Sequence, residues 1–239
     1  LSVSFNPEEG LVFGTVEYVF KCLQPQVDTL FLHASGIDIK TVEFEGSDIS
    51  FRTNEEGLII EFPNTLSWGE APKNLNKRNE VLSASLKNTA VYEIKISYEA
   101  QPQKGIYFIG WNDETNRMRK QIWTQGQGID NRHWIPGYDH QNDKLKTSMT
   151  VEFEEGYTIV SNGIMTRQNA AEGKQTVTYA MDKPHSSYLV MLAIGEFDVR
   201  VLKAKNGVPT YQYFYPGEEE KFEPTYQYSN EMMDWLEEE

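Results

Sequence analysis

Cysteine is almost missing from this 239-residue chain, in which Cys22 is the only one. A lone cysteine excludes a disulfide within the chain and a cysteine-rich zinc site. Basic residues are also scarce, because 22 Lys and Arg stand against 36 Asp and Glu and leave a formal net charge of -14. Binding to phosphate groups needs a basic surface, so we do not expect nucleic acid as a partner.

Long apolar runs are absent as well. None reaches the roughly 20 residues that cross a bilayer, so the sequence contains no candidate transmembrane segment. The chain opens on Leu1 without the basic and apolar segments of a signal peptide, and nothing indicates a compartment. It ends in a Leu-Glu-Glu-Glu run that has no helix cap. We therefore expect it to be part of a longer protein.

The sequence also lacks the common catalytic motifs, including H-E-x-x-H, G-x-S-x-G, the Walker loop and G-x-G-x-x-G. His133 and His140 are a loose pair that would suit a metal, but two hydrated loop side chains are the commoner case; His33 ends a strand and is expected to be structural. Asp139 and Asp143 would suit acid–base work, although chance explains such a pair in a chain this acidic. We predict no catalytic residue and no metal ligand in this chain.

Alternation of apolar and polar residues is what the chain has in abundance. Short alternating segments separated by turns that contain Gly or Asn predict strands. About a dozen such segments predict an all-β fold, either a sandwich or an open barrel-like pair of sheets. The predicted strands cover residues 15–20, 29–33, 39–44, 49–52, 58–62, 90–98, 147–153, 158–161, 176–180, 188–194, 199–205 and 211–215, and residues 64–80 are predicted to be a polar loop.

The pattern changes near the C-terminus. Residues 222–239 place Met232, Met233, Trp235 and Leu236 among Glu and Gln, at a spacing closer to that of a helix than to alternation. We predict a helix there.

One stretch, residues 122–146, does not alternate and is rich in aromatic and amide side chains, which is typical of a rigid binding loop. Within it Gln125 and Gln127 stand beside glycines and two residues apart, so in an extended segment their side chains project to the same side. Glutamine offers both an acceptor and a donor, so the pair suits an ammonium group or a peptide backbone. From the residues alone, solvent-facing amides at a loosened strand end are the simpler interpretation.

Several motifs then occur in an order that resembles one known family. They are Trp123-Thr-Gln-x-Gln127, Arg132-x-Trp-Ile-Pro-x-Tyr-Asp139, the segment MDKPHSSYLVMLAIGEF at 181–197, the Gly-Ile-Tyr at 105–107, and FGTV and LFLHASG at 13–16 and 30–36. Together they resemble the amino-terminal domain of the aminopeptidase N family. These are zinc metallopeptidases of the gluzincin group, which also contains leukotriene hydrolase. The resemblance covers roughly the whole chain.

The resemblance implies a saddle-shaped antiparallel β-sandwich over residues 1–195. Residues 196–239 would be the truncated start of a thermolysin-like α/β catalytic domain, with its first strands and helix. The whole protein would be a zinc-dependent aminopeptidase that removes amino-terminal residues from peptides. Its zinc would be held by an H-E-x-x-H motif that, like the G-x-M-E-N substrate loop, is absent from this sequence. The chain alone is therefore expected to be inactive and to ligate no zinc. Its expected partners are a peptide substrate and the remainder of its own catalytic domain.

In the family, the position of Gln127 binds the free α-amino group of the substrate, and the position of Gln125 lines the same pocket. Both are therefore candidate substrate-binding residues. The family often has P-C-x-D-E-P where this chain has Pro-Gly-Tyr-Asp-His-Gln at 136–141. We expect Arg132 and Asp139 to hold this turn, and Trp134 and Pro136 to pack in the core.

Two other functions stay open. Related saddle domains occur in proteins that have lost the zinc motif, so the whole protein could be a non-catalytic binding or assembly scaffold. A free-standing sandwich could instead bind carbohydrate through Trp111, Trp123 and Trp134.

Overall fold

The computed structural model describes residues 1–67, 90–115 and 117–238. Most of the predicted strands are confirmed. The part of the predicted polar loop at 68–80 lies outside the described residues, and residues 64–66 belong to a strand instead. The elements are β1 (Ser2–Asn6), β2 (Leu11–Phe20), β3 (Val27–His33), β4 (Ile37–Phe44), β5 (Ser47–Asp48), β6 (Phe51–Thr53), β7 (Gly57–Leu66), β8 (Tyr92–Ala100), β9 (Ile106–Ile109), β10 (Gln121–Thr124), η1 (Asp130–His133), β11 (Lys144–Glu154), β12 (Thr158–Ser161), β13 (Ile164–Ala171), β14 (Lys174–Ser186), η2 (Ser187–Leu189), β15 (Leu192–Gly195), β16 (Asp198–Lys203), β17 (Pro209–Phe214), α2 (Glu219–Tyr226) and α3 (Ser229–Glu238).

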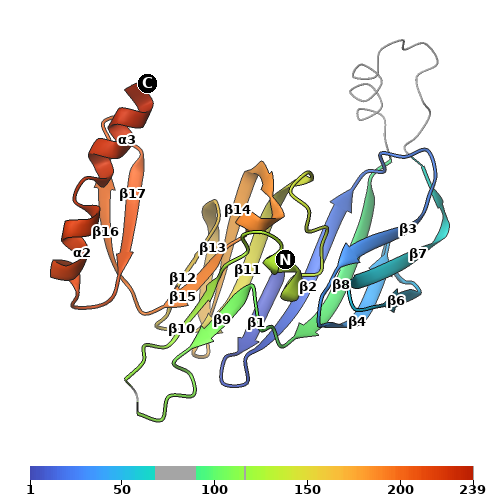
Figure 1. The fold of residues 1–239 in the computed structure, drawn as a ribbon, viewed down its shortest axis with the longest axis horizontal. Helices are drawn as coiled ribbons and strands as arrows, with labels where there is room; N and C mark the ends of the chain where they lie inside the picture. Colours follow the sequence, from blue (N-terminus) through green and yellow to red (C-terminus); the bar gives the residue numbers. More distant parts are fainter. Residues whose placement is uncertain (68–89, 116, 239) are drawn as a thin grey trace.

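The strands form four sheets (Figure 1). The largest has the order β13-β14-β11-β1-β2-β8-β4-β5, and the others are β12-β15-β10-β9, β3-β7-β6 and the hairpin β16-β17. Neighbouring strands run antiparallel, except that β1 pairs in parallel with β11. These mostly antiparallel sheets agree with the predicted β-sandwich fold. The hairpin and the two helices lie to one side of the other sheets and are called here the C-terminal unit, residues 196–238 (Figure 1).

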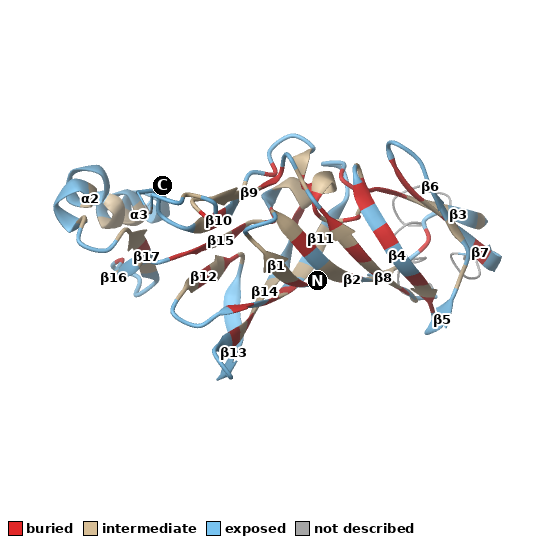
Figure 2. Cartoon of the chain, turned by 90° about the horizontal axis from the view of Figure 1, so that it is seen from below, coloured by how far each residue is buried: buried red, intermediate tan, exposed pale blue. Residues whose placement is uncertain are grey.

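The core follows from strand alternation. In β8, Ile94, Ile96 and Tyr98 are buried, and the residues between them are not. Figure 2 shows the same banding of buried and exposed residues along β4. Because successive side chains of a strand point to opposite faces, one face of most strands of the sandwich joins a single apolar cluster. Trp134 and Ile122, at the base of the amide-rich stretch, belong to this cluster.

Several strand predictions differ from the structure. The strands β1, β9 and β10 were not predicted, and residues 122–124 and 144–146 of the stretch expected to be a loop belong to β10 and β11. The edge strand β13 was not predicted, because all eight of its residues are exposed and it has no buried face to alternate with. Residues 188–194 were predicted as one strand, but the chain first makes the 3-10 turn η2 and enters β15 only at Leu192. The turn carries no buried residue, whereas β15 is almost fully buried.

The predicted C-terminal helix is two helices. Pro224 lies inside α2, where it cannot donate a backbone hydrogen bond and its ring crowds the preceding turn. The helix ends two residues later, and α3 begins at Ser229, whose hydroxyl donates to the carbonyl of Tyr226 (2.7 Å). Neither helix has the length and apolar character that would carry it across a membrane, and the same holds for every helix in the described part of the chain.

Candidate functional site

Strand β10 leads into the glutamine loop, defined here as residues 125–129. It pairs with β9 on one side and β15 on the other, so both of its edges are satisfied. Ile122 is buried, whereas Trp123 and Gln125 are exposed, and this alternation sets the outer face of the sheet. The backbone N–H of Gln125 donates to the carbonyl of Gly105 (2.8 Å), which continues the pairing one residue past the strand.

Gly126 fixes the middle of the glutamine loop to the core. It is buried, and a Cβ at this position would lie 2.4 Å from Nδ2 of Asn131, so a side chain does not fit. The same Nδ2 donates to the carbonyl of Ser187 (2.8 Å), and Oδ1 of Asn131 accepts from Nε1 of the fully buried Trp134 (2.9 Å). The glutamines on either side of Gly126 are both exposed. They therefore project from a loop whose centre is held in place.

A buried ion pair holds the turn that follows, as predicted. Nε and the backbone N–H of Arg132 donate to Oδ2 of Asp139 (3.2 and 3.3 Å), and Ser187 Oγ donates to Oδ1 (2.7 Å). Burial raises the pKa of Tyr18, so its hydroxyl stays protonated, and it donates to the carbonyl of Pro136 (2.7 Å). The Arg132–Asp139 pair is structural, because both oxygens of the Asp139 carboxylate already accept hydrogen bonds.

His33 is the structural histidine that its position predicted. Its Nδ1 accepts a hydrogen bond from the backbone N–H of Asp139 (3.2 Å), which places the ring proton on Nε2. Burial lowers the pKa of His33, and Arg132 and His140 lower it further. The ring is therefore neutral at pH 7 and serves as a fixed acceptor under the turn.

Neither of the loose sequence pairs forms a chemical site. The ring of His140 packs against His33 (centroids 4.7 Å apart) and Tyr138 (5.0 Å), not against His133. Asp139 is buried in its ion pair, whereas Asp143 is exposed, so the two carboxylates do not share an environment. Among the residues that the structure describes, no three His, Cys, Asp or Glu side chains are grouped as a metal site requires.

The tryptophan platform proposed for carbohydrate is wrong. Trp134 is fully buried and Trp111 is 9% exposed, because its indole packs on Phe153 and its Nε1 donates to the carbonyl of Gln121 (3.1 Å). Only Trp123 of the three reaches the surface, at 40% exposed. One ring on this surface does not make a glycan platform.

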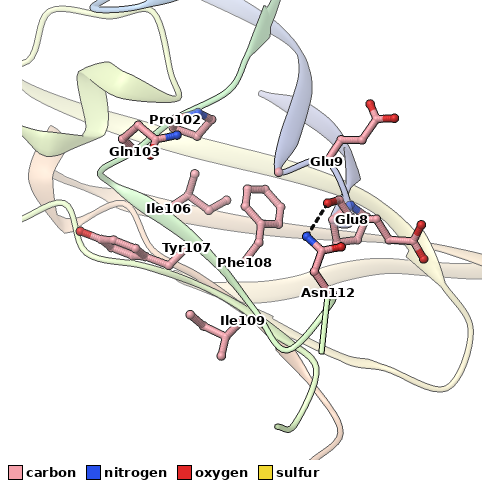
Figure 3. A pocket seen from close by; sticks show the side chains of 11 residues that line it. Glu8, Glu9, Pro102, Gln103, Ile106, Tyr107, Phe108, Ile109 and Asn112 are labelled. Atoms are coloured by element: carbon pink, nitrogen blue, oxygen red, sulfur yellow. Dashed lines mark hydrogen bonds between the residues drawn. The ribbon is translucent and has the colours of Figure 1, made fainter. Parts of the chain in front are cut away.

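Two hollows of the described surface lie close to elements of the site. One hollow of about 260 Å³ lies between the β1–β2 turn and β9, where Nδ2 of Asn112 donates to the carbonyl of Glu8 (2.8 Å; Figure 3). A wider one of about 440 Å³ begins at Ile129, at the end of the glutamine loop, and is lined further by Tyr138 and His140. Gln125 and Gln127 line neither of these two hollows.

Two parts of the site had no signal in the sequence. Asn131 sits in a polar Asp-Asn-Arg-His run that looks like surface, yet it is buried and bonded on three sides. The start of β10 meets the C-terminal unit, where the Tyr215 hydroxyl donates to Oε1 of Gln121 (2.9 Å). A contact over 94 residues of sequence leaves no local pattern.

Comparison with known proteins agrees with this architecture. The model of the peptidase M1 N-terminal domain matches residues 1–189. A puromycin-sensitive aminopeptidase of Caenorhabditis elegans is 25% identical over 213 residues, covering 81% of this chain and 22% of the relative. A leucyl aminopeptidase of Saccharolobus solfataricus is 23% identical over 188 residues, covering 79% of this chain and 20% of the relative. The chain thus spans about a fifth of the length of these relatives.

A solved structure shares the fold. An M1 zinc metallopeptidase from Deinococcus radiodurans superimposes with a TM-score of 0.69 at 16% identity, over 90% of this chain and 46% of the other. At this identity the likeness speaks for the fold alone, but the family match spans more than half of the chain. The sandwich, with its glutamine loop braced on Asn131, is therefore an N-terminal domain of the peptidase M1 family, and the chain belongs to that family.

Proposed function

We propose that this chain is the amino-terminal part of a zinc-dependent aminopeptidase that removes amino-terminal residues from peptides. In this proposal Gln125 and Gln127 line the pocket for the free amino group of the substrate. The relatives that match the chain are named aminopeptidases, and the chain belongs to their family. The observation that carries the assignment is the pair of exposed amides on a loop whose centre, Gly126, is packed against a buried side chain.

The direction of the loop supports the proposal. Gln125 follows Trp123 and Gln121 on the outer face of β10 by strand alternation. Gln121 is the residue that accepts a hydrogen bond from Tyr215 of the C-terminal unit. The face with the amide therefore looks toward the side on which the C-terminal unit lies. The missing wall of the pocket would come from that side.

Zinc belongs to the proposed whole enzyme, and the described residues of this chain do not fit it, since they contain no cluster of ligands. A catalytic zinc supplies an activated water. Nothing in the chain is assigned to that step. Its own contribution is to bind and orient the amino terminus.

Glutamine instead of a carboxylate has a chemical consequence. A carboxylate that faces an ammonium group makes a charge-assisted hydrogen bond, which is roughly twice as strong as a neutral one. Gln127 can accept from the ammonium through its carbonyl oxygen, but it brings no charge. We therefore expect a weaker amino-group anchor than a glutamate would give.

The test uses the full-length protein that contains this chain and a fluorogenic aminoacyl amide. Gln127→Ala should raise KM about tenfold with kcat little changed, because the lost contact is made equally to ground state and transition state. Gln127→Glu should lower KM, because it adds the missing charge. Gln168→Ala, at an exposed glutamine of the edge strand β13, is the matched control and should change neither constant.

Unchanged kinetics of Gln127→Ala would reject the assignment. An inactive full-length protein whose sequence also lacks H-E-x-x-H would favour the scaffold alternative.

A further inference from the structure

A cluster of side chains joins the start of β10 to the C-terminal unit. We call it the β10 joint and define it as Arg119, Gln121, Phe197, Tyr215 and Glu218. Nη2 of Arg119 donates to Oε1 of Glu218 (2.6 Å), and the Tyr215 hydroxyl donates to Oε1 of Gln121 (2.9 Å). The Arg119 guanidinium also lies over the Tyr215 ring, 4.4 Å from its centroid. Two residues of the sandwich are thus tied to two residues that follow β17.

Gly195 makes room for the joint. It pairs with Gln121 across β15 and β10, and a Cβ on it would lie 2.7 Å from Cζ of Phe197. The Phe197 ring therefore covers the sheet where a side chain would otherwise stand. It stacks on the Tyr215 ring (centroids 5.8 Å apart, planes 30° apart), which continues the contact into the C-terminal unit. This explains physically why glycine is followed two residues later by an aromatic residue at this place.

The joint and the glutamine loop are the two ends of one short strand. At about 3.3 Å per residue, the Cα atoms of Gln121 and Gln125 are only about 13 Å apart. Both edges of β10 are hydrogen-bonded, to β9 and to β15, so Gln121 and the start of the glutamine loop keep their spacing within one sheet. A shift of the C-terminal unit against Gln121 would therefore move the amides relative to whatever completes their pocket.

We infer that Arg119 and Tyr215 are positioning residues for the aminopeptidase reaction, because they hold β10, and with it the glutamine loop, in register with the catalytic half. The inference rests on the proposed function. Neither residue touches substrate, and both act through Gln127. The exposed Arg119–Glu218 ion pair alone contributes little free energy. The Tyr215 hydrogen bond and the stacked rings therefore contribute most of the stabilisation of the joint.

The experiment is a double-mutant cycle in the full-length enzyme. Tyr215→Phe keeps the ring and removes the hydrogen bond, and it should raise KM for an aminoacyl amide about fivefold while kcat stays within about twofold. Gln121→Met removes the acceptor of the same bond and should give the same shift. Tyr211→Phe, at an exposed tyrosine of β17, is the matched control and should leave KM unchanged. Thermal unfolding of each variant confirms that it is folded.

The cycle with Gln127→Ala decides the mechanism. If the joint acts through the amide, Tyr215→Phe causes no further rise of KM once Gln127 is gone. An equal rise in both backgrounds, or a lower melting temperature with unchanged KM, would show a merely structural joint and overturn the inference. If Gln127→Ala raises KM and Tyr215→Phe does not, the inference about the β10 joint is rejected and the proposed function stands. If Gln127→Ala is silent, the proposed function and the inference built on it fail together.

Discussion

The sandwich and the C-terminal unit bury their side chains in very different ways. The apolar cluster of the described residues runs from Val3 to Ile194 and includes none of the C-terminal unit. Neither α2 nor α3 contains a buried residue. On α3, Met232, Trp235 and Leu236 are each at least 60% exposed.

The two faces of α3 explain this difference. The side that faces the β16–β17 hairpin makes polar contacts: Asn230 donates to the carbonyl of Lys203 (2.9 Å), and Asp234 accepts from the backbone N–H of Lys205 (2.7 Å). The apolar side, with Trp235, faces away from the hairpin into solvent. A helix normally turns its apolar stripe toward a core. The sandwich thus has its own apolar core, whereas the C-terminal unit exposes apolar side chains of α3 that the described residues do not cover.

The largest effect should come from cutting the chain at this boundary. We expect a peptide of residues 196–239 to be unfolded in water, because an isolated two-stranded hairpin and helices of ten residues or fewer are marginal. Residues 1–195 should retain their sheets and unfold cooperatively. Far-UV circular dichroism and thermal unfolding of the two pieces would check this. A folded peptide would contradict the expectation that residues 196–239 need a core from elsewhere. A sandwich that melts without the peptide would contradict the domain boundary predicted at residue 195.

This contrast marks what could be predicted from sequence. Strands with one buried face, such as β8, alternate visibly, and so do most strands of the sandwich. β13 has no buried face and was missed, and Pro224 divided a helix that spacing alone had joined. An edge strand without a buried face leaves no alternation in its sequence, and the short strands β1, β9 and β10 were missed as well.

The site divides in the same way. The Arg132–Asp139 pair and the core position of Trp134 could be predicted, because all three residues lie in one short turn of the sequence. The support of the loop by Asn131, through carbonyls 56 and 59 residues away, could not be predicted from one sequence. Gln125 and Gln127 were selected through the family resemblance, and their role in substrate binding stays a prediction.

A smaller effect compares ion pairs in the two regions. Arg132→Ala should lower the free energy of unfolding by about 3–5 kcal/mol, because it leaves the Asp139 carboxylate buried without its cation. Lys205→Ala, which removes the exposed partner of Glu238 in the C-terminal unit, should cause no measurable change. Urea titration of both variants provides the measurement. Equal losses would mean that the turn around Asp139 is far more hydrated than its burial indicates.

The smallest expected effect is the difference in unfolding free energy between two Tyr→Phe substitutions inside the sandwich. The Tyr98 hydroxyl is buried and has no hydrogen-bond partner in the described structure, although its ring packs closely over Gly14. Tyr98→Phe keeps the ring and removes an unsatisfied group, so the free energy of unfolding should stay within about 0.5 kcal/mol of wild type or rise. Tyr18→Phe removes the donor to the Pro136 carbonyl and should cost about 1–2 kcal/mol. Denaturation of both variants under identical conditions gives the difference. A loss in Tyr98→Phe as large as in Tyr18→Phe would require a buried partner for Tyr98, because a hydroxyl without one cannot contribute that much.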